Sequence, residues 1–203
     1  KQYYNIDFIE EDEIEEALTP LMLSCASGRH QLSRLLLRYG ADVRRVSADN
    51  ASPLNIAASF GFASIVKLLI QHGSALDHAD FCECTALAWA TIFHFYDCCK
   101  LLLVHGANVN TRDYTGKGLL SAIFTNSYSS DLELKIRLLN LLLDYDVQFI
   151  ADEMFPVLKT YLRKSSSHRE LLEILKHRGL VDDEEILMLT QHDESVDQDF
   201  MVM

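Results

Sequence analysis

A landmark repeated at a fixed step constrains this chain more than any other feature of its sequence. Two kinds of residue recur three times each, always 33 positions apart. They are a hydroxyl residue at Thr19, Ser52 and Thr85, and a glycine at Gly40, Gly73 and Gly106. A period of this size is typical of stacked structural repeats, in which each unit buries its apolar face against the next. The sequence therefore predicts a solenoid.

Each repeating unit reads as two short helices. The opening Thr or Ser, followed by Pro or a small residue, suits a helix start because the hydroxyl caps a free amide and Pro is tolerated in the first turn. First helices are expected near 20–27, 53–60 and 86–93. They end at Gly28 and Gly61, which can take the left-handed conformation that reverses a chain. A second helix follows in each unit, carries three consecutive Leu or Ile residues, and ends at the repeated glycine.

Several short motifs recur within this pattern. They are TPL at 19–21, SPL at 52–54, paired Ala57 and Ala58, IVKLL at 65–69, GADV at 40–43 and GANVN at 106–110. The pattern resembles the ankyrin repeat, closely over residues 14–147 and more weakly to about residue 180. The resemblance implies an all-α, ankyrin-type solenoid of about five stacked helix-turn-helix repeats with hairpin fingers.

The resemblance also gives a domain organisation. An acidic flank is expected at 1–18, a repeat array at 19–180, and a short helix with an acidic tail at 181–203. The individual repeats are placed near 14–46, 47–79, 80–112, 113–150 and 151–180.

The fourth and fifth units depart from the regular pattern. Gly118 replaces the opening Thr of the fourth unit, and Asp146 stands where a glycine is expected, 40 residues after the last one. We therefore predict an insertion at 126–135, between the two helices of that unit. The fifth unit is degenerate, with Pro156 and Gly179 as its landmarks. Terminal repeats are expected to be atypical because one face meets solvent.

Charge is concentrated at the two ends of the chain. The net charge is −12, and residues 1–18 hold 7 acidic residues while residues 182–203 hold 8. Residues 19–181 contain the remaining 15 acidic residues and 17 basic residues, so this part of the chain is nearly neutral. This balance argues against nucleic acid as a partner, which needs a basic face. No apolar run approaches the ~18 residues that cross a bilayer.

The cysteines indicate a reducing compartment. Their number, five, is odd, and they lack the spacing of a disulfide framework. We expect an intracellular protein, cytoplasmic or nuclear, and a chain that is part of a longer protein.

Catalytic and metal sites are weighed against simpler interpretations. Cys82, Cys84 and His78 lie within seven residues, but a C-x-C pair without a distant partner motif favours an ordinary hairpin tip over zinc. His94 replaces the helix-ending glycine of the third unit, where a structural role in a left-handed turn is expected. No nucleophile, phosphate-loop or metalloprotease signature is present. We expect no enzyme activity, no metal and no cofactor.

A partner-binding surface is predicted from position within the repeat. The resemblance implies that hairpin fingers at 44–51, 77–84 and 111–117, together with the first helices, form a concave binding face. The candidate partner-binding residues are Asp49, Phe60, Phe81, Glu83, Ile92, Phe93 and Tyr114. Large apolar residues at variable sites before the helix-ending turn favour binding over packing alone. Trp89, in contrast, aligns with positions that face a neighbouring repeat and is expected in the core.

These features predict a non-catalytic protein-interaction module within a larger scaffold or adaptor. Its partner would be a protein or peptide with an apolar anchor and basic residues. Two alternatives stay open: the substrate-recognition region of a ubiquitin-ligase receptor, and a purely structural spacer with no preferred partner. The oligomeric state and the identity of the partner do not follow from the sequence.

Overall fold

The computed structural model describes residues 18–125, 131–164 and 169–190. The chain divides into two compact units, Lys1–Gln148 and Phe149–Met203. Each unit is described by itself below. The acidic flank at 1–17, part of the predicted insertion and the acidic tail lie outside the described residues.

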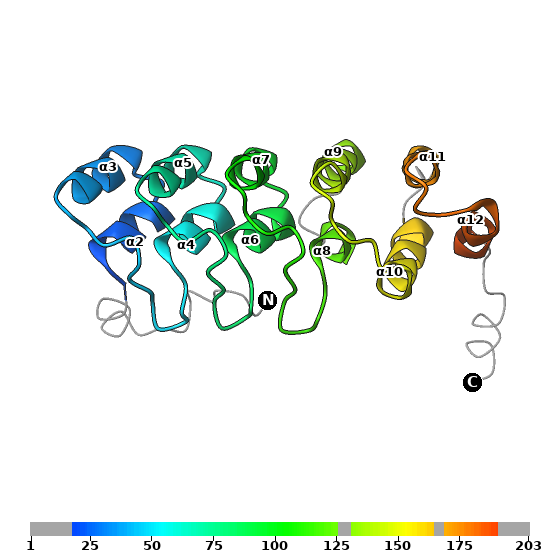
Figure 1. Cartoon of the computed structure of the whole chain (residues 1–203), viewed down its shortest axis with the longest axis horizontal. Coiled ribbons are helices and arrows are strands. Elements are labelled where there is room, and N and C mark those ends of the chain that lie inside the picture. The colour runs from blue at the N-terminus through cyan, green and yellow to red at the C-terminus, as the bar shows by residue number, and fades with distance from the viewer. Residues whose placement is uncertain (1–17, 126–130, 165–168, 191–203) are drawn as a thin grey trace, which may run out of the picture. The chain divides into compact units, whose positions relative to one another are not determined.

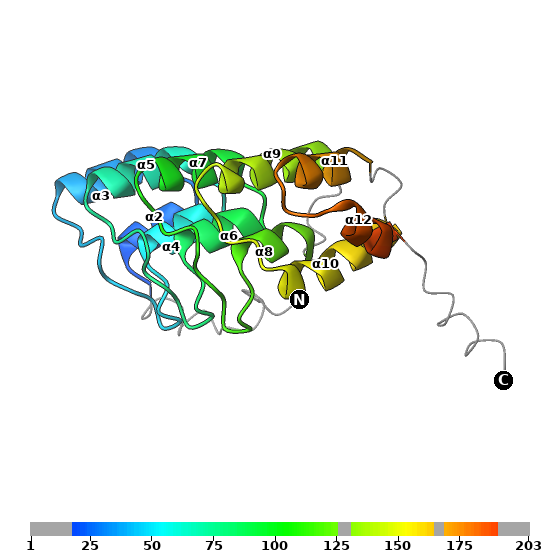
Figure 2. The same ribbon diagram turned by 45° about the vertical axis from the view of Figure 1, so that its right-hand side comes forward.

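Stacked helix pairs form the described part of the first unit. The pairs are α2 (Pro20–Ala26) with α3 (His30–Arg38), α4 (Pro53–Ser59) with α5 (Ala63–Gln71), α6 (Ala86–Ile92) with α7 (Tyr96–Val104), and α8 (Leu119–Thr125) with α9 (Leu132–Leu143). The first helices contact one another in chain order, and so do the second helices. Figures 1 and 2 show the resulting two layers, with the loops between pairs extending from the first-helix layer. The predicted ankyrin-type solenoid is confirmed.

The hydroxyl landmark caps the first helix of three repeats. The side-chain oxygens of Thr19, Ser52 and Thr85 each accept a hydrogen bond, at 3.2 Å, from the backbone amide three residues later. Such a bond satisfies one of the free amides at a helix start and stabilises the helix by about 1 kcal/mol. The helix start predicted from each Thr or Ser therefore holds.

The fourth repeat corrects one detail of the sequence analysis. Residues 132–135 belong to α9, which is longer than the other second helices, so they do not form a loop. Residues 126–130 of the predicted insertion lie outside the described residues. Asp131 caps α9 by accepting from Leu134 N at 3.2 Å. Asp146 has a φ of 58°, which confirms that it takes the place of the helix-ending glycine.

An aromatic ring explains why Gly28 and Gly61 carry no side chain. A Cβ on Gly28 would lie 2.7 Å from the Phe62 ring, and a Cβ on Gly61 would lie 2.5 Å from the Phe95 ring. Each glycine also has a positive φ, so a side chain would be strained as well as crowded. The turns of the first and second repeats are thus each covered by a phenylalanine of the following repeat.

His94 holds the same position in the third repeat with a φ of 60°. Its ring is 4% exposed, and its Nε2 donates to the Ile123 carbonyl in α8 at 3.0 Å. Among the described residues, its Nδ1 has no hydrogen-bond partner. The predicted left-handed turn is present, and the histidine adds a bond between the third and fourth repeats.

Apolar side chains are exposed on the first helix pair. Leu23, Leu32 and Leu35 are exposed, whereas their equivalents 33 residues later, Ile56, Ile65 and Leu68, are buried. Leu32, for example, is 38% exposed, whereas Ile65 is 0% exposed. In the described residues, the first pair therefore lacks the neighbour that covers this face in the second pair.

The second unit contains α10 (Ala151–Lys164), α11 (Arg169–His177) and α12 (Asp183–Thr190). Pro156 lies inside α10 and not at a helix start, so its use as an opening landmark was wrong. Gly179 follows α11 with a φ of 67°, as expected of a helix-ending glycine. α12 packs against α10.

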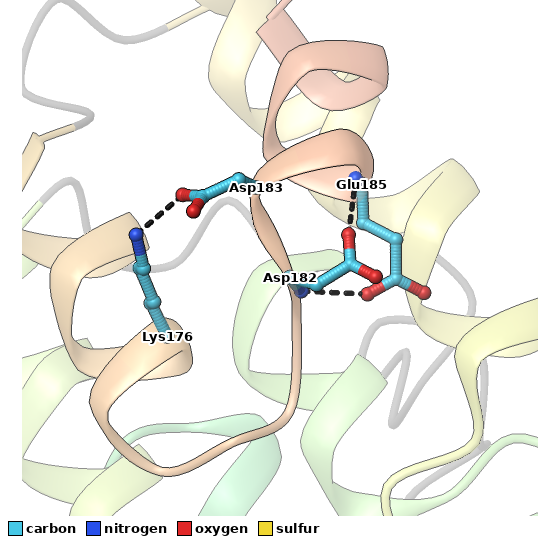
Figure 3. A network of polar contacts seen from close by, with 4 residues as sticks. All are labelled: Lys176, Asp182, Asp183 and Glu185. Carbon is cyan, nitrogen blue, oxygen red and sulfur yellow. Dashed lines mark hydrogen bonds and ion pairs between the residues drawn. The ribbon is translucent and has the colours of Figure 1, made fainter.

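A reciprocal pair of hydrogen bonds caps α12. Asp182 Oδ1 accepts from the Glu185 amide, and Glu185 Oε2 accepts from the Asp182 amide, both at 2.8 Å. Lys176 at the end of α11 forms an ion pair with Asp183 (Figure 3). The cap and the ion pair fix the connection between the last two helices. None of the helices in the described ranges combines the length and apolar character needed to cross a membrane.

Candidate functional site

The loops between the first-unit repeats are hairpin fingers built on one repeated turn. The amides of Ser47, Asp80 and Asp113 donate to the carbonyls of Ala51, Cys84 and Lys117, at 3.0, 3.2 and 3.0 Å. The fourth residue of each turn, Asn50, Glu83 or Gly116, has a positive φ. Asn and Gly tolerate this conformation, whereas Glu83 takes it at some cost. The finger geometry is therefore common to the repeats, and its side chains differ.

Backbone hydrogen bonds join neighbouring fingers into a row. The Phe81 amide donates to the Asp49 carbonyl at 3.1 Å, and the Tyr114 amide donates to the Cys82 carbonyl at 3.0 Å. His78 Nε2 adds a bond of 2.7 Å to the Asn50 carbonyl. The tips of neighbouring fingers are thus held at a fixed spacing.

Asp80 connects the middle finger to helix α6. Its Oδ1 accepts from the amides of Cys82 and Cys84, at 2.9 and 3.1 Å. Its Oδ2 accepts from Trp89 Nε1 at 2.6 Å. Asp80 is buried, and Trp89 is 2% exposed, so the predicted core position of Trp89 matches the structure. Asp80 therefore holds the indole at its N–H group, and Phe93 stacks on its face with ring centroids 5.9 Å apart.

A pocket of about 310 Å³ opens between the third and fourth repeats. Trp89, Ile92 and Phe93 line it from α6 and its end. Asp113, Tyr114, Thr115 and Lys117 line it from the finger, and Ala122 and Thr125 from α8. The pocket therefore combines aromatic and apolar side chains with one carboxylate and one ammonium group.

The structure brings only some of the predicted binding residues into this pocket. Ile92, Phe93 and Tyr114 line it. Phe81, 73% exposed, and Glu83 lie at the finger tip next to it, in the same row as Asp49. We call the finger tips and the C-terminal ends of α4 and α6 the finger face.

Two of the predicted aromatic residues also have packing roles. Phe93 is half-buried and lies between Trp89 and Phe95, with 6.1 Å between its ring centroid and that of Phe95. Phe60 is more exposed and stacks on Phe62, also at 6.1 Å. Truncation of Phe93 would therefore remove packing contacts as well as exposed aromatic surface.

Neighbouring carboxylates act on the two cysteine thiols of the middle finger. Burial raises the pKa of the pocket-lining Cys84 thiol to about 12, and the negative charges of Asp80, Asp113 and Glu83 contribute to this shift. Burial and the carboxylates of Asp80, Asp49 and Asp113 also raise the pKa of Cys82. Both thiols are therefore protonated at neutral pH, and the potential around them is negative.

The candidate zinc ligands do not converge. The described ranges bring together no group of three or more His, Cys, Asp or Glu side chains able to hold a metal ion. His78 uses Nε2 to bind a backbone carbonyl, and Cys84 is buried in the finger. These contacts support the hairpin interpretation of this segment.

The comparison with protein families agrees with this architecture. A family model described as ankyrin repeats (3 copies) matches residues 4–80 and 21–113. The chain belongs to the ankyrin repeat family. Ankyrin repeats are generally protein–protein interaction modules, and the family is typically non-catalytic. None of the curated proteins matches the chain.

Sequence reasoning missed several residues of this ankyrin surface. Asp80 and Asp113 occupy the same place in successive fingers, 33 residues apart, and that register was the available signal. The preceding finger has Ser47 at this place, so the acidic pattern is not complete. The Ser47 hydroxyl accepts a hydrogen bond from the Ala51 amide, as the Asp80 and Asp113 carboxylates do from the equivalent amides of the later fingers. Lys117 carries no pattern that marks it in advance.

Proposed function

We propose that the chain is a non-catalytic recognition module that binds a protein or peptide partner on its finger face, within a larger scaffold or adaptor. The observation that carries the proposal is a pocket lined by Tyr114, 57% exposed, together with Phe81, 73% exposed, at the tip of the preceding finger. Exposed aromatic groups around a pocket are typical of binding sites, because a partner can bury them.

The charge of the finger face indicates the chemistry of the partner. Asp49 and Glu83 are exposed at the tips, and the carboxylates of Asp80 and Asp113 add to the field. A partner with an apolar anchor and basic residues would complement this surface, with the charges acting chiefly on encounter and specificity. A structural spacer would have no reason to expose aromatic groups at the tips of fixed fingers.

An intracellular location, cytoplasmic or nuclear, fits the cysteines. All five are free, and four of them are buried. Burial raises the pKa of Cys25, Cys98 and Cys99 to about 12, so they behave as small apolar groups in the core. Reduced thiols of this kind are usual in proteins of a reducing compartment.

A peptide-display selection tests the proposed function. The full chain is used to select peptides from a random library, and the selected peptides are measured against two double variants. Phe81→Ser with Tyr114→Ser alters the finger face, and Tyr39→Ser with Val104→Ser alters similarly exposed apolar groups at the C-terminal ends of second helices. We expect at least a tenfold loss of affinity for the first pair only. Equal affinity for both variants, or a loss confined to the second, would contradict the proposal.

A further inference from the structure

One oxygen of the pocket carboxylate is available to a partner. Asp113 Oδ1 accepts from the Thr115 amide, the Thr115 hydroxyl and the Lys117 amide, at 2.8, 2.6 and 3.0 Å. In the described part of the chain, every hydrogen bond that this carboxylate receives ends on Oδ1. Oδ2 is therefore left for a donor from outside. The turn fixes the carboxylate, so its position does not depend on the partner.

The pocket also offers aromatic surface beside that carboxylate. Tyr114, 57% exposed, lines the pocket from the finger beside Asp113, and the stacked rings of Trp89 and Phe93 complete the lining from α6 and its end. The face of an aromatic ring carries partial negative charge and attracts cations, and a planar guanidinium stacks on it especially well. Aromatic rings and a carboxylate therefore favour the same kind of ligand at this position.

The volume of the pocket limits what can enter. Sites for drug-sized molecules span about 300–1,000 Å³, and this pocket, at about 310 Å³, is at the lower limit. It suits one large side chain better than a folded segment or a cofactor. A purely apolar side chain would remove water from the Asp113 carboxylate without supplying a donor, which is unfavourable.

We propose that the pocket binds an arginine side chain of the partner, which packs on the Tyr114 ring and donates to Asp113 Oδ2. This inference rests on the proposed function and assigns the basic group of the partner to one place. The exposed apolar groups of the finger tips are left for the apolar anchor. Lys117 also lines the pocket, but it is exposed on a flexible stem and can turn toward solvent. Its charge should weaken arginine binding without preventing it.

Three small probes test the assignment on the full chain. N-acetyl methylamides of arginine, lysine and norleucine are titrated while the fluorescence of Trp89, the only tryptophan of the chain, is followed. We expect arginine to bind with a Kd in the millimolar range, about tenfold more tightly than norleucine and several-fold more tightly than lysine. Equal binding of norleucine or lysine would overturn the assignment, as would the absence of arginine binding.

Two substitutions with opposite expected effects complete the test. Asp113→Asn keeps an oxygen for the turn and removes the charge, so it should weaken arginine binding at least fivefold and leave norleucine unchanged. Lys117→Gln leaves the backbone bond of the turn intact and should strengthen arginine binding two- to threefold. If neither changes arginine binding, or if Lys117→Gln weakens it, the proposal is wrong. Thermal unfolding of each variant checks that it is folded. If Asp113→Asn does not fold, the effect of Lys117→Gln on arginine binding decides the test.

The outcome can be separated from that of the proposed function. If arginine does not bind but the selected peptides still lose affinity on substitution of Phe81 and Tyr114, only the arginine assignment fails. If substitution of Phe81 and Tyr114 does not change the affinity of the selected peptides, the proposed function fails as well.

Discussion

His94 should make the junction between the third and fourth repeats sensitive to acid. Its Nε2 donates to a backbone carbonyl, so Nε2 carries the hydrogen and the neutral ring leaves Nδ1 as an acceptor. Protonation would add a buried N–H for which the described residues provide no acceptor. Lys135 in α9, 3% exposed, is the charged group that acts on the ring.

The direction of the effect follows from the pKa of His94. Burial lowers this pKa below its ordinary value, the bond to the Ile123 carbonyl opposes the shift, and the charge of Lys135 lowers the pKa further. The unfolded chain therefore binds the proton more readily than the folded one. Stability is full above the unfolded pKa of about 6.5 and falls as the pH drops below it. One such group costs up to about 1.4 kcal/mol between pH 7.5 and 5.5.

Urea unfolding of the full chain at both pH values measures this loss. His94→Asn is the informative variant, because Asn tolerates the left-handed turn and does not titrate. It should lose less stability between pH 7.5 and 5.5 than the unsubstituted chain, whereas His72→Asn, at an exposed position, should change nothing. Lys135→Met should raise the pKa of His94 and reduce the acid loss. Equal acid losses in His94→Asn and the unsubstituted chain would refute the reasoning.

Three further expectations can be tested by unfolding measurements. Ile65→Ala should lower the free energy of unfolding by about 3 kcal/mol, and Leu32→Ala should lower it by less than about 1 kcal/mol. Equal losses would mean that another part of the chain covers the first repeat. Asp80→Asn should cost about 2 kcal/mol because both oxygens of this buried carboxylate accept hydrogen bonds, whereas Asp113→Asn should be nearly neutral. Deleting residues 192–203, which lie outside the described residues, should lower the melting temperature by only a few degrees; a larger drop would give the tail a structural role.

The regular part of the fold could be predicted because each landmark has a local physical cause. Thr19 and Ser52 each cap the helix that follows them directly, and Gly28 is required by its backbone conformation and by the ring that covers it. Pro156, in contrast, does not by itself specify a helix start. Proline at a helix start and proline inside a helix look alike when the repeat around them is degenerate, and only the structure distinguishes them.

The candidate site was less predictable because it depends on contacts between repeats. Position within the repeat selected Ile92, Phe93 and Tyr114 as candidate binding residues, and all three line the pocket. It did not show that Phe93 packs between two other rings, nor that Asp113 keeps one oxygen free of turn hydrogen bonds. Such facts depend on how side chains pack and on which oxygen each amide reaches, and a one-dimensional pattern does not record them.

The finger row separates the requirements of folding from those of recognition. Its spacing is set by backbone bonds, such as those from the Phe81 and Tyr114 amides, which would persist if the side chains changed. The buried Asp80 then connects this row to the indole at the base of the pocket. Exposed tip side chains can therefore differ without cost to the array, whereas Asp80 cannot. Substitutions at the tips should change which partner binds to the finger face. Substitution of Asp80 should lower the affinity for any partner of that face, because it disturbs the spacing of the fingers.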